Sequence, residues 1–302
     1  MSDSISRRRL LSTAALAVGS LSLIDQSRSA AGAANRPPGD PYRGLKIGVA
    51  TYTFRKFPAD EMIKFVKRSG MKYVSVKDFH LKLNSTPDER KALAEKLKAA
   101  GIAPLSCGVI AMNNEKNAQH AFEYARDLGA PTIVCSTDPK ALPILDKMVK
   151  DHDIRLAIHN HGPDTKIFQT PDEIFEHIKD LDPKIGLCID IGHTLRAGTD
   201  PAASIRKCAS RLHDIHLKDV SAAEKKGSCV EAGRGVLDFK AVLRAMLDVK
   251  FAHLAGWEYE KDADDPLPGL QESNGYVKGL LAGMEQARQT ERGPAAERAW
   301  AI

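Results

Sequence analysis

The stretch RLAIHNH at residues 155–161 is an apolar run that ends in two histidines. Three later stretches close in the same way on histidine, aspartate or glutamate: IGLCID at 185–190, LHDIHLK at 212–218 and LAGWEYE at 254–260. A helix-like segment separates each run from the next. The pattern is typical of a parallel α/β protein, in which the C-terminal ends of successive strands meet at one rim and present the functional side chains.

The same alternation of strand and helix continues over the rest of the chain. Apolar runs predict strands at 46–53, 73–77, 103–110, 132–136, 155–159, 185–190, 212–217 and 253–258. Apolar residues at three- and four-residue spacing predict helices near 59–69, 86–100, 114–128, 138–151, 171–180, 200–209, 238–248 and 272–288. Three of these helices are followed directly by a glycine, at Gly70, Gly101 and Gly129. Glycine is common there because a helix often ends with a residue in the left-handed conformation.

Strand–helix repetition with short connections predicts a parallel sheet with right-handed crossovers. Eight units close most simply into a single α/β domain, a (β/α)8 TIM barrel. A doubly wound open sheet is the alternative, but it usually carries a glycine-rich loop after its first strand, and residues 51–55 here read TYTFR. Residues 219–237 contain three glycines and are expected to form a long irregular loop after the seventh strand.

Residues 1–33 are expected to be a twin-arginine signal peptide. Residues 6–11 read SRRRLL, an apolar run extends over 10–24, and AGA at 31–33 offers a cleavage site. An uncleaved anchor is the alternative, although about 15 apolar residues fall short of the ~20 that span a bilayer. This interpretation predicts a periplasmic or otherwise exported protein, with a linker at 34–43, the barrel at 44–288 and a C-terminal tail at 289–302.

Charge and cysteine content narrow the class of protein. The formal net charge is +5, and it falls to +3 without residues 1–33, which hold four Arg and two Asp. So small an excess does not indicate a nucleic-acid partner. The five cysteines are odd in number, and Cys107, Cys135 and Cys188 fall inside expected strands. They are predicted to be buried free thiols, and their spacing does not indicate a zinc site.

The polar ends of the fifth to eighth strands predict a metal site. His159, Asp190, His216 and Glu258 would offer two imidazole nitrogens and two carboxylates at one rim. This mixed donor set suits one divalent ion of the type Mn²⁺, Co²⁺, Zn²⁺ or Fe²⁺ better than Ca²⁺. The alternative for any one of these residues alone is an ordinary hydrogen bond at the rim.

Further polar residues are expected around that site. Because side chains alternate along a strand, His161 shares a face with His159, Lys218 with His216, and Glu260 with Glu258. Lys218 is expected either to bind a substrate hydroxyl and stabilise an oxyanion, or to be simply solvated.

Other rim residues are predicted to bind substrate or to support the site. Asp219 is expected to orient a ligand or cap the following loop, and His193 to support the site or contact substrate. Lys77, Asp78 and His80 end the second strand at the same mouth. Phe54, Phe79 and Trp257 could form an apolar wall for a sugar ring, with core packing as the alternative. The predicted substrate-binding set is Lys77, His80, His193, Lys218 and Trp257.

With these motifs the chain resembles the sugar phosphate isomerase/epimerase superfamily with the xylose-isomerase-like barrel, most of all its exported twin-arginine members. The resemblance covers about residues 44–288 and is strongest at 157–163, 188–193, 215–219 and 257–260. It implies one divalent ion held by Glu, Asp, His and Glu from strands five to eight. Asp190, His216 and Glu258 match the last three, whereas His159 stands where many members have Glu. One of the two glutamates that shuttle protons in the epimerases is therefore replaced, and His159 could be a ligand, a base or neither.

These observations predict a metal-dependent isomerase or epimerase acting on a sugar or sugar-derived polyol, by proton abstraction next to a carbonyl. Glu258, Glu260 and His161 are the candidate bases, with Lys218 as an assisting group. A lyase or dehydratase that expels a β-substituent, including from a 3-keto-glycoside, is the first alternative, and a non-catalytic carbohydrate-binding barrel is the second. An apurinic-site endonuclease is disfavoured, because strands ending near Val109 and Thr137 supply no ligands for its three zinc ions.

The expected partner is therefore a small-molecule carbohydrate. Neither nucleic acid nor a stable membrane span after processing is expected, and a homo-oligomer is left open.

Overall fold

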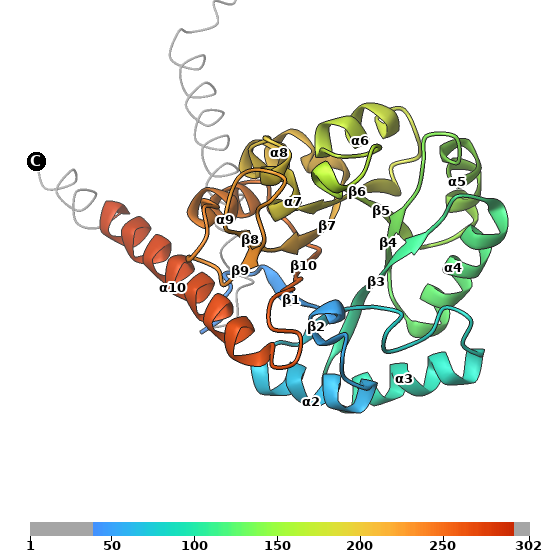
Figure 1. The fold of residues 1–302 in the computed structure, drawn as a ribbon, viewed down its shortest axis with the longest axis horizontal. Coiled ribbons are helices and arrows are strands. Elements are labelled where there is room, and N and C mark those ends of the chain that lie inside the picture. The colour runs from blue at the N-terminus through green and yellow to red at the C-terminus, as the bar shows by residue number, and fades with distance from the viewer. Residues whose placement is uncertain (1–38, 293–302) are drawn as a thin grey trace, which may run out of the picture. The chain divides into compact units, whose positions relative to one another are not determined.

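The computed structural model describes residues 39–292, and those from Leu45 onward contain a closed parallel barrel of eight strands (Figure 1). Each strand pairs in parallel with its neighbours, in the cyclic order β1-β10-β7-β6-β5-β4-β3-β2. The strands are β1 (Lys46–Ala50), β2 (Tyr73–Val76), β3 (Ala103–Ala111), β4 (Thr132–Ser136), β5 (Arg155–His159), β6 (Ile185–Asp190), β7 (Leu212–Leu217) and β10 (Leu254–Trp257). The predicted (β/α)8 TIM barrel is confirmed.

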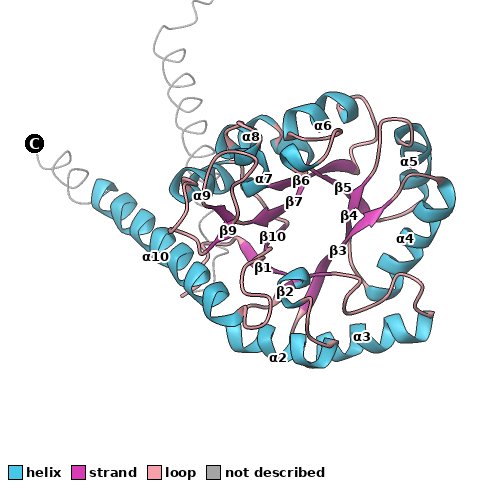
Figure 2. Cartoon of the chain, viewed as in Figure 1, coloured by secondary structure: helices cyan, strands magenta, loops and turns pink. Residues whose placement is uncertain are grey.

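Helices surround the strands as an outer ring (Figure 2). They are α2 (Ala59–Ser69), α3 (Pro87–Ala99), α4 (Glu115–Leu128), α5 (Leu142–Met148), α6 (Pro171–Ile178), α7 (Ile191–Arg196), α8 (Pro201–Lys207), α9 (Phe239–Asp248) and α10 (Leu267–Arg292). Short 3₁₀ turns occupy Thr51–Phe54, Val149–Asp151, Gly162–Asp164 and Ala209–Arg211.

The barrel strands are covered on both faces, which explains their continuous apolar runs. Every residue of β6 and of β7 is buried, as expected for a parallel sheet with helices outside and packed side chains inside. Val134, Ala157 and Cys188 pack together in the core, with Val109 against them. Polar residues therefore accumulate only where the strands end, and this positions the site.

Local sequence signals explain the helix boundaries. Thr86 and Glu89 form a capping box at the start of α3, in which each side chain accepts a hydrogen bond from the backbone N–H of the other residue. Such a cap contributes about 1 kcal/mol. Gly70 and Gly129 end α2 and α4 with φ of 75° and 76°, the left-handed region that favours glycine.

Three elements were not predicted: helix α7 and two short strands. Helix α7 begins directly after β6, because the Asp190 side chain accepts a hydrogen bond from His193 N and caps it. Within 219–237, predicted as irregular, β8 (Asp219–Val220) and β9 (Cys229–Val230) pair antiparallel. Helix α10 runs to Arg292, so the first residues of the predicted tail are helical.

The predicted signal peptide at 1–33 and most of the linker at 34–43 lie outside the described residues. Within residues 39–292, none of the helices combines the length and the apolar character needed to cross a membrane. The five cysteines are free, and Cys229 is the one that is not fully buried. Burial raises the pKa of Cys135 and of Cys208 to about 12, so these thiols stay protonated.

Histidine burial near the N-terminal end of β7 predicts a pH-dependent stability. Burial lowers the pKa of His213 to about 4, and its Nε2 bonds Pro183 O at 3.0 Å. In the unfolded chain this histidine titrates near 6.5, so its protonation favours unfolding as pH falls from about 6.5 to 4. The loss should reach about 2–3 kcal/mol. In urea unfolding of the metal-free protein, His213→Gln should reduce the dependence of the unfolding free energy on pH between about 6.5 and 4. The exposed His177→Gln is the control and should leave that dependence unchanged. Equal slopes in wild type and His213→Gln would contradict the prediction.

Candidate metal centre

Four side chains from neighbouring strand ends form a compact group at one rim of the barrel. His159 ends β5, Asp190 ends β6, His216 lies near the end of β7, and Glu258 directly follows β10. One ligand atom from each lies within 4.8 Å of the others, and all four residues are buried. We call these four residues the donor cluster.

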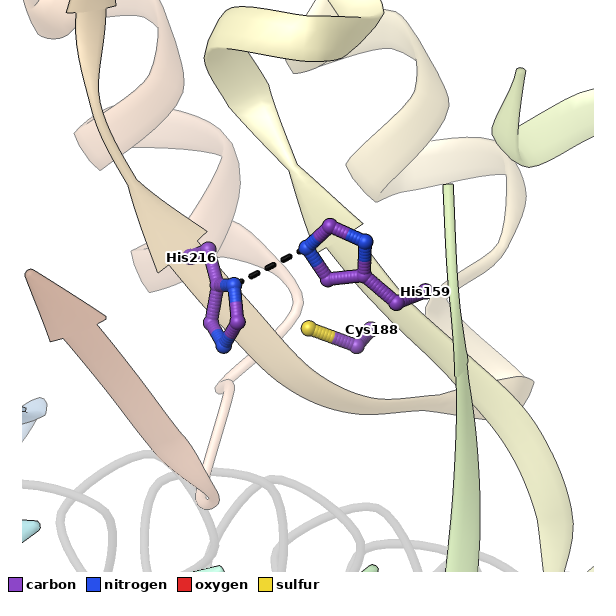
Figure 3. Close-up of side chains that lie close together, drawn as sticks. All are labelled: His159, Cys188 and His216. Carbon is purple, nitrogen blue, oxygen red and sulfur yellow. Dashed lines mark hydrogen bonds between the residues drawn. The ribbon is translucent and has the colours of Figure 1, made fainter. Parts of the chain in front are cut away.

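The separations within the donor cluster suit a single ion. His159 Nε2 lies 2.9 Å from His216 Nδ1 (Figure 3) and 3.7 Å from Asp190 Oδ2. His216 Nδ1 lies 3.2 Å from Glu258 Oε2. Ligands held at about 2.1 Å by one tetrahedral ion lie roughly 3.4 Å apart. Asp190 Oδ2 is buried and makes no hydrogen bond with a described residue, so it is available as a ligand atom. Together with the distances, this shows that the four residues fit a divalent ion.

The protonation states also suit metal binding. Burial holds the pKa of His159 well below its usual value, so its ring is neutral at neutral pH. Burial acts to raise the pKa of Asp190, but the Lys218 ammonium and the nearby imidazoles outweigh it and hold that pKa well below its usual value. Burial also acts to raise the pKa of Glu258, but Lys77 and other neighbours outweigh it and hold that pKa well below its usual value. The cluster therefore offers neutral imidazole and ionised carboxylate, which are the forms that bind metal.

Lys218 balances the negative charge of the carboxylates. Its Nζ lies 3.1 Å from Asp190 Oδ2, 3.2 Å from Glu258 Oε2 and 2.5 Å from Glu260 Oε1. Burial acts to lower the pKa of Lys218, but the three carboxylates raise it well above its usual value. The side chain therefore stays cationic and is not solvated. It can donate a hydrogen bond to a substrate oxygen at the edge of the donor cluster.

His161 and His193 lie beside the donor cluster. His161 Nδ1 is 3.4 Å from His159 Nδ1, on the side of that ring away from the cluster. His193 N donates to Asp190 Oδ1 at 2.8 Å. Gly162 has φ +59°, and a Cβ there would lie 2.5 Å from His193 O, so glycine is required between these segments. The donor nitrogen thus comes from His159, and His161 is its neighbour.

The predicted substrate-binding residues separate into two groups. Lys77 Nζ lies 3.1 Å from Glu258 Oε1, so the second strand does reach the site. His80 is buried and held by Thr51 Oγ1 at 3.0 Å and Phe54 O at 3.1 Å. Trp257 is 1% exposed, and its ring centroid lies 5.8 Å from that of Phe239 on α9. The structure brings Lys77, Lys218 and His193 to the rim, whereas Trp257 belongs to the packing between β10 and α9.

Asn160 and Thr194 support the site and were missed in the sequence. Asn160 Oδ1 accepts from Asp190 N at 3.0 Å, and its Nδ2 donates to Thr194 Oγ1 at 3.1 Å. Thr194 Oγ1 in turn donates to Asp190 O at 2.7 Å. These bonds hold the backbone where β6 turns into α7. The available signal was the position of Asn160 between two rim histidines.

Cys188 is an alternative third donor beside His159 and His216 (Figure 3). Cys188 precedes Asp190 by two residues on β6, and its thiol donates to Asp214 Oδ1 at 3.8 Å. Burial raises its pKa well above the usual value, so the thiolate that binds metal is disfavoured. The set with Asp190 and Glu258 is the better fit.

Asp219 organises the loop beside the site, which settles the two roles considered for it. Its carboxylate accepts hydrogen bonds from the backbone N–H groups of Val220, Gly233, Gly235 and Leu237 at 2.8–3.2 Å. A Cβ at Gly235 would overlap this carboxylate. Asp219 is therefore a loop cap and makes no contact that would orient a metal ligand.

Sequence comparisons identify relatives of the chain. The model of the family described as Xylose isomerase-like TIM barrel matches residues 63–280. An inosose dehydratase of Geobacillus thermodenitrificans is 28% identical over 232 residues, which cover 61% of this chain and 76% of the relative. An inosose dehydratase of Clostridium tetani is 29% identical over 143 residues, which cover 42% of this chain and 46% of the relative. The chain thus spans about half the length of some curated relatives that it matches.

Solved structures share the barrel. A protein of Parabacteroides distasonis is 25% identical with a TM-score of 0.62, over 78% of this chain and 98% of its own. The IolI protein with a zinc atom is 16% identical with a TM-score of 0.66, over 79% and 99%. The 3-keto-D-glucoside 4-epimerase of E. coli is 15% identical with a TM-score of 0.65, over 78% and 99%. The last two show a common fold.

The donor cluster predicts metal content that depends on both imidazoles. Protein purified without chelators should carry about one divalent ion per chain by mass spectrometry. His159→Ala and His216→Ala should each lose it, because removing one of four ligands weakens binding by orders of magnitude. The exposed His177→Ala on α6 is the control and should retain it, since this ring lies outside the cluster and its neighbours. Full metal content in His159→Ala would exclude His159 as a ligand.

The cap at Asp219 predicts a loss of stability on truncation. Asp219→Ala removes the acceptor of several backbone amides and should cost about 2–3 kcal/mol in urea unfolding. Asp219→Asn keeps one acceptor oxygen and should cost less. Equal stability of Asp219→Ala and wild type would show that solvent replaces the cap.

Proposed function

The chain belongs to the xylose isomerase-like TIM barrel family, and on that premise we propose that it is a divalent-metal-dependent lyase. Its substrate would be a keto-sugar or cyclic keto-polyol from which it eliminates a β-substituent such as hydroxide. The observation that carries the proposal is the donor cluster with a further carboxylate, Glu260, outside it and paired with Lys218. The relatives named inosose dehydratase support the same reaction class.

The number of bases at the site distinguishes the reactions. Epimerisation at one carbon removes a proton from one face and returns another to the opposite face, so it needs two bases. In the related epimerases, a second glutamate stands at the position of His159. Here His159 Nε2 faces His216 and Asp190, which supports a role as ligand and leaves one base. Elimination needs only one base, because the proton it removes can leave with the expelled group.

His159, Asp190, His216 and Glu258 would hold the ion, and a bound divalent ion supplies Lewis-acid polarisation of the substrate carbonyl. Lys218 stays cationic and would donate a hydrogen bond to a substrate oxygen as negative charge develops there. With His159 ligating through Nε2, its Nδ1 carries the proton and donates to His161 Nδ1, which lies 3.4 Å away. His161 Nε2 then keeps a proton that it can donate to a further substrate hydroxyl.

Glu260 is the proposed base. Its Oε1 lies 2.5 Å from Lys218 Nζ, and the side chain is 37% exposed. A substrate bound at the donor cluster could therefore reach it. The hydroxyl of Thr53 accepts from Tyr259 N and donates to Trp257 O, which fixes the segment that carries the base. Glu260 would take the proton next to the carbonyl and return it to the departing hydroxide. The C–H and C–O bonds break, a C=C bond conjugated with the carbonyl forms, and water leaves.

An isomerase is the second candidate, because the same single base could return the proton to the neighbouring carbon. Lys218 and Glu260 would serve both reactions, and the relatives named inosose dehydratase support elimination as the first choice. The export predicted from residues 1–33 adds weight to a substrate without phosphate, since phosphorylated sugars are scarce outside the cytoplasm.

Turnover of an inosose and of a 3-keto-glucoside in D₂O tests the proposal. The metal-loaded protein should convert either substrate into an enone, which is measured by its ultraviolet absorbance. The inosose should lose water, and the 3-keto-glucoside should lose its alcohol. Glu260→Gln should lower kcat by about 10²–10⁴-fold with metal content unchanged, because only the base is removed. The exposed Glu224→Gln is the matched control. Exchange of deuterium into the substrate or an isomer without enone would support the isomerase instead.

A further inference from the structure

The second nitrogen of His216 is the least satisfied atom beside the donor cluster. Nδ1 faces His159 and Glu258, and Figure 3 shows Nε2 at the opposite end of the ring, pointing away from His159. Nε2 is buried and makes no hydrogen bond with any described residue. A histidine that binds metal through one nitrogen carries a proton on the other, and that N–H normally has a partner. Nothing in the donor cluster supplies it.

Asp214 offers the missing acceptor. It precedes His216 by two residues on β7, so both side chains share the inner face of the strand. Asp214 is 0% exposed, and its Oδ2 likewise lacks a hydrogen bond. Its Oδ1 has a 3.8 Å contact from the thiol of Cys188, which is a weak donor. Two unpartnered buried atoms of opposite hydrogen-bonding character, a ring nitrogen that can donate and a carboxylate oxygen, thus lie on one strand face.

We propose that Asp214 is a positioning residue that accepts the Nε2 proton of His216 through one buried water. This bond would hold His216 in the tautomer whose Nδ1 lone pair faces the donor cluster. A buried carboxylate without a partner destabilises a fold, so a role at the site accounts for its presence here. The inference rests on the metal site of the proposed function and is independent of the reaction.

The first test is the tautomer of His216 in the metal-free protein at pH 8, from ¹⁵N chemical shifts of the imidazole nitrogens. Wild type should show Nε2 protonated and Nδ1 free. Asp214→Val suits a strand and removes the acceptor, so it should populate the other tautomer. Asp214→Asn retains one acceptor oxygen and should keep most of the wild-type tautomer. A wild-type tautomer in Asp214→Val would overturn the proposal.

The second test separates positioning from structural support. Calorimetry should show Zn²⁺ binding weakened about 10–100-fold in Asp214→Val and less in Asp214→Asn. Unfolding of the metal-free Asp214→Val protein should change far less than its Zn²⁺ affinity, because relief from burying a carboxylate offsets the loss of one hydrogen bond. Affinity and metal-free stability falling together would mark Asp214 as structural and overturn the inference. Where Asp214→Val does not fold, Asp214→Asn carries both readouts.

Ser106→Ala is the matched control. Ser106 is buried, and its hydroxyl also lacks a hydrogen bond in the geometry of the described residues. Burial raises the pKa of Asp214 to about 6, and His216 and, to a lesser degree, Ser106 act to lower it. This variant should keep the wild-type tautomer and Zn²⁺ affinity, whereas a loss equal to that of Asp214→Val would contradict a specific role for the carboxylate. Failure of wild type to bind Zn²⁺ would contradict the proposed function. The His216 tautomer, measured in the metal-free protein, would still test whether Asp214 positions that ring.

Discussion

The balance of buried charge at the rim is the constraint on which the site depends. Asp190, Glu258 and Glu260 meet around the Lys218 ammonium, and Lys77 contacts Glu258 from the other side. Carboxylates this close would repel one another and take up protons without these cations. The lysines keep Asp190 and Glu258 ionised, which is the form of a carboxylate that binds metal. The rest of the rim serves to hold these groups at the correct distances.

Histidine in place of glutamate at position 159 changes that balance. It removes one negative charge from a site that already contains two ammonium groups, so a bound divalent ion would leave the surroundings more positive than in a site with two glutamates. Such surroundings favour the negative charge that develops on a substrate oxygen during proton abstraction. The same replacement removes one base. The loss of a base favours elimination or isomerisation over two-base epimerisation, whereas the change of charge assists all three reactions.

The support around the ligands forms a second level of organisation. Asn160 and Thr194 hold the backbone of Asp190, and Asp219 gathers the amides of the neighbouring loop. Strand alternation in the sequence predicted the residues of the donor cluster, because each one lies at the end of an apolar run. It could not find Asn160 or the outward packing of Trp257, because contacts between different strands and helices decide those positions. Helix α7 was missed for a related reason, since its cap, Asp190, had been read as a ligand only.

By itself the sequence determined the barrel, because eight apolar runs separated by amphipathic segments can bury their surface in few other ways. It also determined which rim residues carry imidazole or carboxylate groups. Only the tertiary structure decided that His159, and not His161, turns a nitrogen toward His216, and that Lys218 is buried among three carboxylates. It also showed that Trp257 faces α9. Those outcomes depend on the register and twist of neighbouring strands, which set side-chain distances that no single segment encodes.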